Sequence, residues 1–325
     1  MAEISVGSAI GAGFELIGKR PLTVLTWGLV RVGLVAVILA LYAPTLIGVF
    51  AEIAAKSQTG LKPSEADMQQ MMSHFALMQG ASALLNIVNL LVGSVIICAV
   101  ARAIVHPERG AFASMRVGGP ELYVVVLSFG AGIVFAFGIM ICAIPFIIVG
   151  VILGTQHMWV ALAVVIALAV LVLFLALIYI IARFAFVVPM MVDDGQFHLF
   201  DAWALTKGKV GSIVLIGFCL MLIGMALGTL VELVLIGVGV GGLAAAAGGV
   251  SNLQAFFTQT PPDQILTKLA PWIGFFVLLL IPVQGAATAI FIAPWAKAYR
   301  DVVPALPPVQ PTASAPPAQL FGAAP

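Results

Sequence analysis

The amino-acid sequence predicts an all-helical membrane protein whose chain crosses the bilayer six times. Of its 325 residues 62% are apolar and 8% are charged, and the mean hydropathy of +1.19 lies far outside the range of soluble domains. Six apolar runs are each long enough to cross the hydrocarbon core as a helix, which takes about 20 residues. Composition and run length together therefore predict the fold class, and the positions of the cations predict its orientation.

The predicted spans are residues 22–50, 81–105, 122–154, 159–191, 212–247 and 272–295. Strands of a membrane barrel would alternate apolar and polar residues, whereas 161–181 is apolar at nearly every position. The runs are therefore expected to be helices. Together they form one membrane domain, 1–303, followed at 304–325 by a Pro- and Ala-rich segment without charge that is expected to be a flexible cytoplasmic tail.

Lysine and arginine crowd into alternate gaps between the runs. Ten lie in one set of gaps with the termini, three lie in the other set, and Arg31 lies inside the first run. Cytoplasmic loops carry this excess of cations, so both termini are expected in the cytoplasm of a multi-pass protein, with a bacterial cytoplasmic membrane as the expected location. No cleavable signal peptide is expected, because Lys19 and Arg20 follow the first short apolar patch.

Three short amphipathic segments precede the outward-going spans. In the first, Ile10, Phe14 and Ile17 recur at the spacing of one helix face. Segments with apolar or aromatic residues beside cations suit a helix in the headgroup plane, and a linker with incidental periodicity is the alternative. The predicted membrane-interface residues are Phe14, Lys19, Arg20, Phe112, Arg116, Phe200, Trp203, Lys207 and Lys209. With the spans, the segments suggest a plan of amphipathic segment and helical hairpin that is repeated three times.

Two outward spans are longer than one crossing needs. The run 122–154 would measure about 50 Å as a helix, against a hydrocarbon core of about 30 Å. Pro145 is the expected kink in this span, and the glycines of 237–242 are expected to loosen the fifth span. A long tilted helix is the alternative in both cases. Loops are expected on the outer side at 51–80, where 67–72 is expected to be helical, and at 250–271.

Few polar side chains lie inside the spans. Ionisable groups there are costly unless paired or hydrated, so a coupling role is one interpretation, and snorkelling or a structural hydrogen bond is the favoured one. The amides are expected to hold helices together, although they are also the candidates to line a solute path. The intramembrane polar residues are Arg31, Asn86, Asn89, Glu232 and Gln284.

One cluster resembles a metal or acid–base site. Asp194, His198 and Asp201 would share one face of a helix at i, i+4 and i+7. The favoured interpretation is structural: Asp193, Asp194 and Gly195 form a turn that caps a helix beginning near Gln196. No catalytic motif is recognisable, so an enzyme is the weaker class, and no cofactor, metal or nucleic-acid partner is expected.

A family resemblance appears in the second half of the chain. A span ending at Pro189 is followed by an acidic turn at 193–195, an Ala-x-x-x-Thr-Lys-Gly pattern within 201–209, and a further span; residues 298–301 add to the likeness. The chain in this respect resembles YciC-like bacterial membrane proteins and the membrane domain of some glycerophosphodiester phosphodiesterases. The resemblance implies a multi-helix membrane domain. It implies no catalytic residues, because no phosphodiesterase domain is present in this sequence.

Two functions are open at this point. The first is a non-catalytic membrane protein that organises or senses the bilayer, or scaffolds partners, through its cytoplasmic interfacial helices. The second is a transporter or channel for a small or lipidic solute, which would need a hydrated cavity near the intramembrane amides. The first is favoured because spans this apolar offer few groups to line an aqueous path. The expected partners are membrane lipids, and a homo-oligomer or another membrane protein is possible by composition.

Overall fold

The structure is a computed structural model that describes residues 3–59, 65–108, 112–156 and 158–303. The described residues contain helices and no strand, and six helical segments are long and apolar enough to cross a membrane. The predicted all-helical class and number of candidate spans are therefore confirmed. The long helices are α2 (Pro21–Thr59), α3 (Glu65–Val105), α4 (Gly119–Thr155), α5 (Trp159–Phe184), α8 (Val210–Ala247) and α10 (Pro262–Val302).

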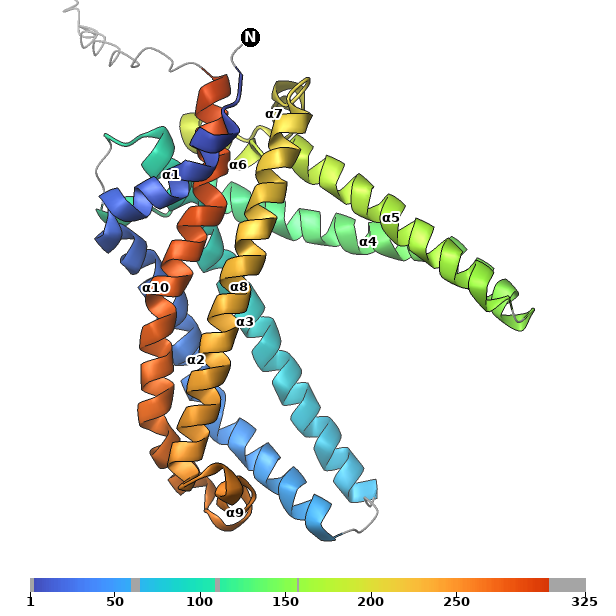
Figure 1. The fold of residues 1–325 in the computed structure, drawn as a ribbon, viewed down its shortest axis with the longest axis vertical. Coiled ribbons are helices and arrows are strands. Elements are labelled where there is room, and N and C mark those ends of the chain that lie inside the picture. Colours follow the sequence, from blue (N-terminus) through green and yellow to red (C-terminus); the bar gives the residue numbers. More distant parts are fainter. Residues whose placement is uncertain (1–2, 60–64, 109–111, 157, 304–325) are drawn as a thin grey trace, which may run out of the picture.

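Short elements complete the chain between these helices. They are α1 (Val6–Lys19), the 3-10 turn η1 (Phe112–Ser114), α6 (Val187–Asp194), α7 (Leu199–Leu205), the 3-10 turn η2 (Val250–Asn252) and α9 (Leu253–Gln259). Helix α1 packs mainly on α10, close to where α10 ends and α2 begins (Figure 1). We call this region the α1 end of the molecule. The predicted tail at 304–325 lies outside the described residues.

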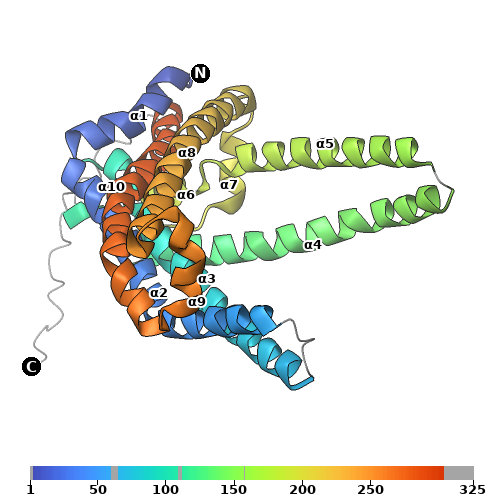
Figure 2. The same ribbon diagram turned by 60° about the horizontal axis from the view of Figure 1, so that its bottom comes forward.

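The long helices fall into two groups. Helices α2, α3, α8 and α10 pack together, whereas α4 and α5 form a hairpin that leaves this group at a wide angle (Figures 1 and 2). Among the hairpin side chains that the structure describes, the buried ones lie near the α1 end: Glu121, Val124 and Ala182. The main hydrophobic core also lies at the α1 end, where α1, α3, α6, α8 and α10 meet. The apolar surfaces farther along the helices remain exposed, as lipid-facing surfaces do.

Helices α2 and α10 pack with their backbones in contact. A Cβ added to Gly28 of α2 would lie 1.9 Å from the Ile281 carbonyl oxygen of α10, and one added to Gly285 would lie 2.2 Å from the Val24 oxygen. Gly13 likewise brings α1 close to α10, because a Cβ added to it would lie 2.6 Å from the Cα of Ile290. Close packing through small residues is a common means of association for helices in lipid, where the hydrophobic effect does not drive one helix onto another.

The fourth predicted span lies within one candidate span, Trp159–Asp194, but its helix is interrupted near the end. The sequence predicted one helix over 159–191, but α5 ends at Phe184 and α6 begins at Val187. The break turns α6 into the core, where Phe186, Val187 and Met191 are almost completely buried. The same apolar residues that extended the predicted span therefore pack against protein at the α1 end.

Two long spans remain helical at the places where a kink or a loosened helix was expected. Helix α4 runs unbroken past Pro145, and α8 runs unbroken through the glycines of 237–242 to Ala247. The first predicted outer loop is largely helix, because α2 extends to Thr59 and α3 begins at Glu65; the expected helix at 67–72 is confirmed. The second outer loop contains η2, α9 and the start of α10.

Candidate functional site

The polar side chains at the α1 end gather around the last turn of α3. Arg300 of α10 donates a hydrogen bond from Nη1 to the Ile104 carbonyl at 2.9 Å, and Arg20 donates from Nη2 to the Pro107 carbonyl at 3.0 Å. The final carbonyls of a helix lack partners within the helix and carry partial negative charge. Arg300 therefore satisfies one of the last carbonyls of α3 and joins it to α10, while Arg20, just before α2, binds the turn that follows α3.

A buried ion pair joins α3 to α4. Arg102 donates to a carboxylate oxygen of Glu121, and the two side chains are 9% and 4% exposed. Arg102 also donates to the Ser114 carbonyl at 2.6 Å, and the indole Nε1 of Trp27 donates to the Ala113 carbonyl at 2.9 Å. The second carboxylate oxygen of Glu121 is buried without a hydrogen-bond partner in the described part of the chain. The charges are thus compensated, and the connection between α3 and α4 is held from both sides.

These contacts explain why the second predicted interfacial segment is not an α-helix. Ala113 and Ser114 have φ values of 51° and 55°, which side chains other than glycine seldom adopt and which cost about 1 to 3 kcal/mol each. The hydrogen bonds to their carbonyls, from Trp27 and Arg102, hold this conformation. The described part of the segment is therefore the single turn η1, and the prediction of an interfacial α-helix at this place is wrong.

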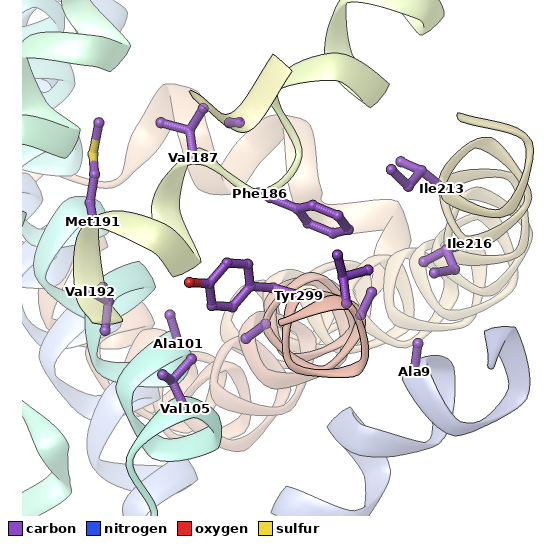
Figure 3. Packing of buried hydrophobic residues seen from close by; sticks show 14 of the residues in the cluster. Ala9, Ala101, Val105, Phe186, Val187, Met191, Val192, Ile213, Ile216 and Tyr299 are labelled. Atoms are coloured by element: carbon purple, nitrogen blue, oxygen red, sulfur yellow. The ribbon is translucent and has the colours of Figure 1, made fainter. Parts of the chain in front are cut away.

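A second polar contact joins α6 to α10 and α3. The Tyr299 hydroxyl donates to Oδ2 of Asp193 at 2.9 Å, and Nε2 of His106 lies 3.3 Å from the Asp193 carbonyl oxygen and 3.4 Å from its Oδ1. The Tyr299 ring packs edge to face on Phe186, with Met191 and Val192 nearby (Figure 3). Asp193 therefore takes part in helix packing at the end of the core.

The acidic turn predicted at 193–195 ends a helix and does not begin one. Gly195 adopts φ 76° at the C-terminal end of α6, and Oδ1 of Asp194 accepts a hydrogen bond from the Gln196 amide at 2.9 Å. Helix α7 starts only at Leu199, so the expected start near Gln196 and the shared helix face are wrong. The turn itself is confirmed, because the left-handed Gly195 requires the chain to change direction there.

His198 lies between two carboxylates in the link from α6 to α7. Its Nδ1 is 2.7 Å from Oδ2 of Asp201, and its Nε2 faces Oδ2 of Asp194. The hydrogen bond to Asp201 is the main cause that raises the pKa of His198 above its ordinary value; burial opposes it, and the hydrogen bond to Asp194 adds to the rise. In the described part of the chain no three His, Cys, Asp or Glu side chains are placed to hold one metal ion.

Helix α7 is clamped onto the end of α5 by an arginine between two aromatic rings. The Arg183 guanidinium lies 5.1 Å from the Tyr179 ring centroid and 4.9 Å from that of Trp203, and it donates to the Tyr179 hydroxyl at 2.8 Å. Thr206, which is fully buried, donates to the Trp203 carbonyl at 3.1 Å. Ala202 is the buried face of α7, so Phe200 projects outward and is 79% exposed.

The predicted interface residues fall into two groups. Lys19 pairs with Glu15, whose pKa this lysine lowers, and Arg20 binds the Pro107 carbonyl. The others that the structure describes are exposed or half-buried, and among described side chains the cations of this second group have no partner. They are Phe14, Arg116, Phe200, Trp203, Lys207 and Lys209. The side chain of Phe112 lies outside the described ones.

The predicted intramembrane polar residues do not come together. Arg31 lies 3.5 Å from the Thr288 hydroxyl of α10, while Asn86, Asn89 and Glu232 are exposed on the surfaces of α3 and α8. Gln284 is half-buried on α10, where its carbonyl accepts the Thr288 hydroxyl at 2.7 Å. Arg31 therefore binds a hydroxyl group of a neighbouring helix, and the three exposed side chains face outward from the helices.

Sequence reasoning missed the residues that hold the α1 end together. Glu121 escaped attention because it stands just before an apolar run, at the first turn of a helix where a carboxylate is ordinary. The other residues stand inside predicted spans or beside the cations at the ends of spans, where a structural role does not show in the sequence. They are Trp27, Arg102 and Tyr299. A carboxylate and an arginine at the ends of consecutive spans are the one sequence feature that could have indicated the buried pair.

Comparison of the chain with known protein families, with curated proteins and with solved structures found no match. The chemistry of the α1 end must therefore be judged from its geometry alone. Most of its carboxylates are engaged by arginine, lysine, tyrosine or histidine of the same chain, and the contacts of Glu121 and Asp193 join helix ends. The groups that remain available to a ligand are the exposed aromatic rings and the unpaired cations near α7.

Proposed function

We propose that this protein is a non-catalytic, multi-pass membrane protein that attaches to the inner leaflet along its α1 end and organises lipid or holds a membrane partner there. The observation that carries the proposal is the outer face of α7. Phe200 is 79% exposed on a helix that Trp203 and Thr206 hold against the end of α5, and the Trp203 ring is still 38% exposed beside that contact. Aromatic side chains on a fixed platform beside free cations suit the headgroup region of a membrane.

The proposed orientation places the α1 end in the cytoplasm. The helix order brings together the gaps that carry ten of the fourteen Lys and Arg residues. Several of these cations bind carbonyls within the protein, as Arg20 and Arg300 do, while Lys207 and Lys209 have no partner among the described residues. The free lysines follow α7 directly, so the aromatic face and the attraction to anionic lipid coincide.

Helix α1 supports the same arrangement. Its buried face consists of small residues and Leu16, packed on α10, while Phe14 is 49% exposed on another side. In the segment between η1 and α4, Val117 is 90% exposed beside Arg116, which has no partner among the described residues. We infer that the three segments at α1, η1 and α7 each present an apolar or aromatic group and a cation to one leaflet, in the threefold plan that the sequence predicted.

The scattered polar residues of the spans support attachment to the leaflet over transport. A solute path needs groups that converge, and Asn86, Asn89 and Glu232 instead lie on exposed helix surfaces. A groove between α4 and α5 is lined almost wholly by apolar groups and offers little to a polar solute. Transport of a small or lipidic solute stays the alternative, and a liposome flux assay that detected passage would favour it.

The proposal is tested by measuring how deep α7 lies in the membrane. A spin label at Phe200→Cys, in a background without native cysteines and in anionic nanodiscs, is expected to be more accessible to oxygen than to a water-soluble nickel chelate. The matched control is Gln196→Cys, four residues away in the exposed link, where the chelate is expected to dominate. Equal chelate accessibility at the two positions would overturn the proposal.

A further inference from the structure

Helix α3 carries a stripe of polar side chains along one side. We call it the α3 polar stripe, and its residues are Gln79, Ser82, Asn86, Asn89 and Gly93. Their spacing alternates between three and four residues, as in the seam of a left-handed coiled coil. No other polar side chain occurs between 79 and 93, so the polarity of this part of α3 is confined to the side that a neighbouring helix would contact.

The two asparagines of the stripe lie deep inside the candidate span Phe75–Val105. The span has 31 residues, which is about 46 Å as a helix and exceeds a hydrocarbon core of about 30 Å by roughly 8 Å at each end. Asn86 lies about 16 Å along the helix from Phe75, and Asn89 lies about 24 Å from Val105. Both amides are therefore at the depth of the acyl chains.

The part of the chain that the structure describes leaves this stripe uncovered. Asn86 and Asn89 are exposed, and neither has a hydrogen-bond partner among the described residues. A Cβ added to Gly93 would meet no atom within 4 Å, and the first half of α3 extends away from α8 and α10 (Figure 1). An amide without a partner in hydrocarbon is costly, so the stripe requires a cover that both donates and accepts hydrogen bonds.

We propose that the α3 polar stripe joins two copies of this chain in a parallel α3–α3 dimer. Copies that insert with the same topology place identical residues at the same depth, so each asparagine meets its own counterpart across a twofold axis. An asparagine amide has a donor and an acceptor, so two identical side chains satisfy one another. Paired asparagines in such a seam also fix the register of the two helices.

The occupant is a second copy because the requirement is so specific. A different membrane protein would need polar groups at the same depths and at the same heptad spacing, whereas a second copy has them by its own sequence. Lipid chains offer no hydrogen-bond partner to an amide. The dimer uses α3 and goes beyond the proposed attachment of α7 to the leaflet.

Oxidative cross-linking tests which side of α3 meets the second copy. The full-length protein carries Ser82→Cys in a background without native cysteines and is oxidised in bacterial membranes. A disulfide requires Cα atoms within about 7 Å, so this variant is expected to form a covalent dimer several-fold faster than Leu84→Cys. Leu84 is the matched control because it is 43% exposed and lies two residues away, on the opposite side of the helix. Both variants keep the two asparagines, and equal rates would overturn the proposal.

Energy transfer between copies measures the strength of the dimer. Donor and acceptor dyes on Gln196→Cys, in the exposed link, report association in phosphatidylcholine liposomes as added lipid dilutes the protein. Asn86→Leu combined with Asn89→Leu is expected to weaken association roughly tenfold, because two hydrogen-bonded pairs are lost. Glu232→Leu removes an exposed polar group of α8 and is expected to leave association unchanged.

Three results of this assay would overturn the inference. One is a double asparagine variant that associates as well as the unmodified chain, and another is an equal loss in Glu232→Leu. The third is a protein that stays monomeric at every ratio of protein to lipid. Thermal unfolding confirms that the variants fold. A failure here is distinguishable from a failure of the proposed attachment, because the depth of Phe200 is measured separately on α7.

Discussion

The substitution Gly28→Ala tests the close contact between α2 and α10. The new Cβ would lie 1.9 Å from the Ile281 carbonyl oxygen and 2.9 Å from the Gly285 amide nitrogen. Both contacts are with backbone atoms, so no side chain can rotate away. Carbon and carbonyl oxygen approach to about 3.3 Å at closest, so the helices must separate by roughly 1.4 Å at this point.

The expected cost follows from that separation. A gap of 0.5 to 1 Å already forfeits about a quarter to a half of each dispersion contact, and overpacked sites lose about 1 to 3 kcal/mol. Alanine is the better helix former by about 1 kcal/mol, which offsets part of the loss. We expect the folded state to lose about 2 kcal/mol, which for a chain of this size lowers the Tm by roughly 3 °C.

The assay is thermal unfolding of purified protein in detergent, followed by the exposure of the buried Cys98 to a thiol-reactive dye. Gly285→Ala approaches the same contact from α10 and is expected to behave alike. Gly33→Ala is the matched control, because nothing lies within 4 Å of its added Cβ on the same helix. If Gly28→Ala melts at the temperature of Gly33→Ala, the close packing of α2 on α10 is refuted.

Two further predictions concern charge at the α1 end. Glu121→Gln leaves Arg102 buried without a counter-charge and is expected to lower the free energy of unfolding by about 3 kcal/mol, measured by thermal unfolding. The control Glu108→Gln, at an exposed position, is expected to leave the stability unchanged. Equal stability of the two variants would contradict the buried pair. The raised pKa of His198, caused first by its hydrogen bond to Asp201, stabilises the start of α7 fully below the ordinary pKa of about 6.5, and this contribution is lost as the pH rises through the folded-state value. Amide exchange of α7, corrected for its intrinsic pH dependence, is expected to accelerate over that interval, and His198→Gln is expected to remove the pH dependence; an unchanged profile in the variant would contradict this role.

The number and type of the long helices could be predicted because membrane partition depends on local composition. A run of about 20 apolar residues lowers its free energy in lipid whichever helices surround it, and hydrogen bonding within the segment then requires a helix. The boundaries were less predictable. Phe186 and Met191 are as apolar as any lipid-facing residue, but they pack inside the core of the α1 end, so α5 ends at Phe184.

The candidate site was predicted only in its chemistry. The sequence predicts Phe200, Trp203 and Lys207 as interface residues, and all three side chains are exposed in the structure. It offered no means to tell that Arg20 binds a carbonyl at the end of α3 while Lys207 has no partner among the described residues. Both are cations beside a span, and their difference depends on which helix end lies within reach.

The sequence by itself therefore determined the solvent of this protein, its helical class and the segregation of its charges, because each follows from residues that are near one another in the chain. The tertiary structure decided which helices touch and which stand apart. Gly28 meets Gly285, Arg102 meets Glu121, and α4 and α5 leave the other helices, because side-chain fit between segments distant in the sequence sets these contacts. An apolar helix face has nearly the same free energy against lipid as against protein, so composition alone cannot tell a lipid-facing surface from a helix–helix contact.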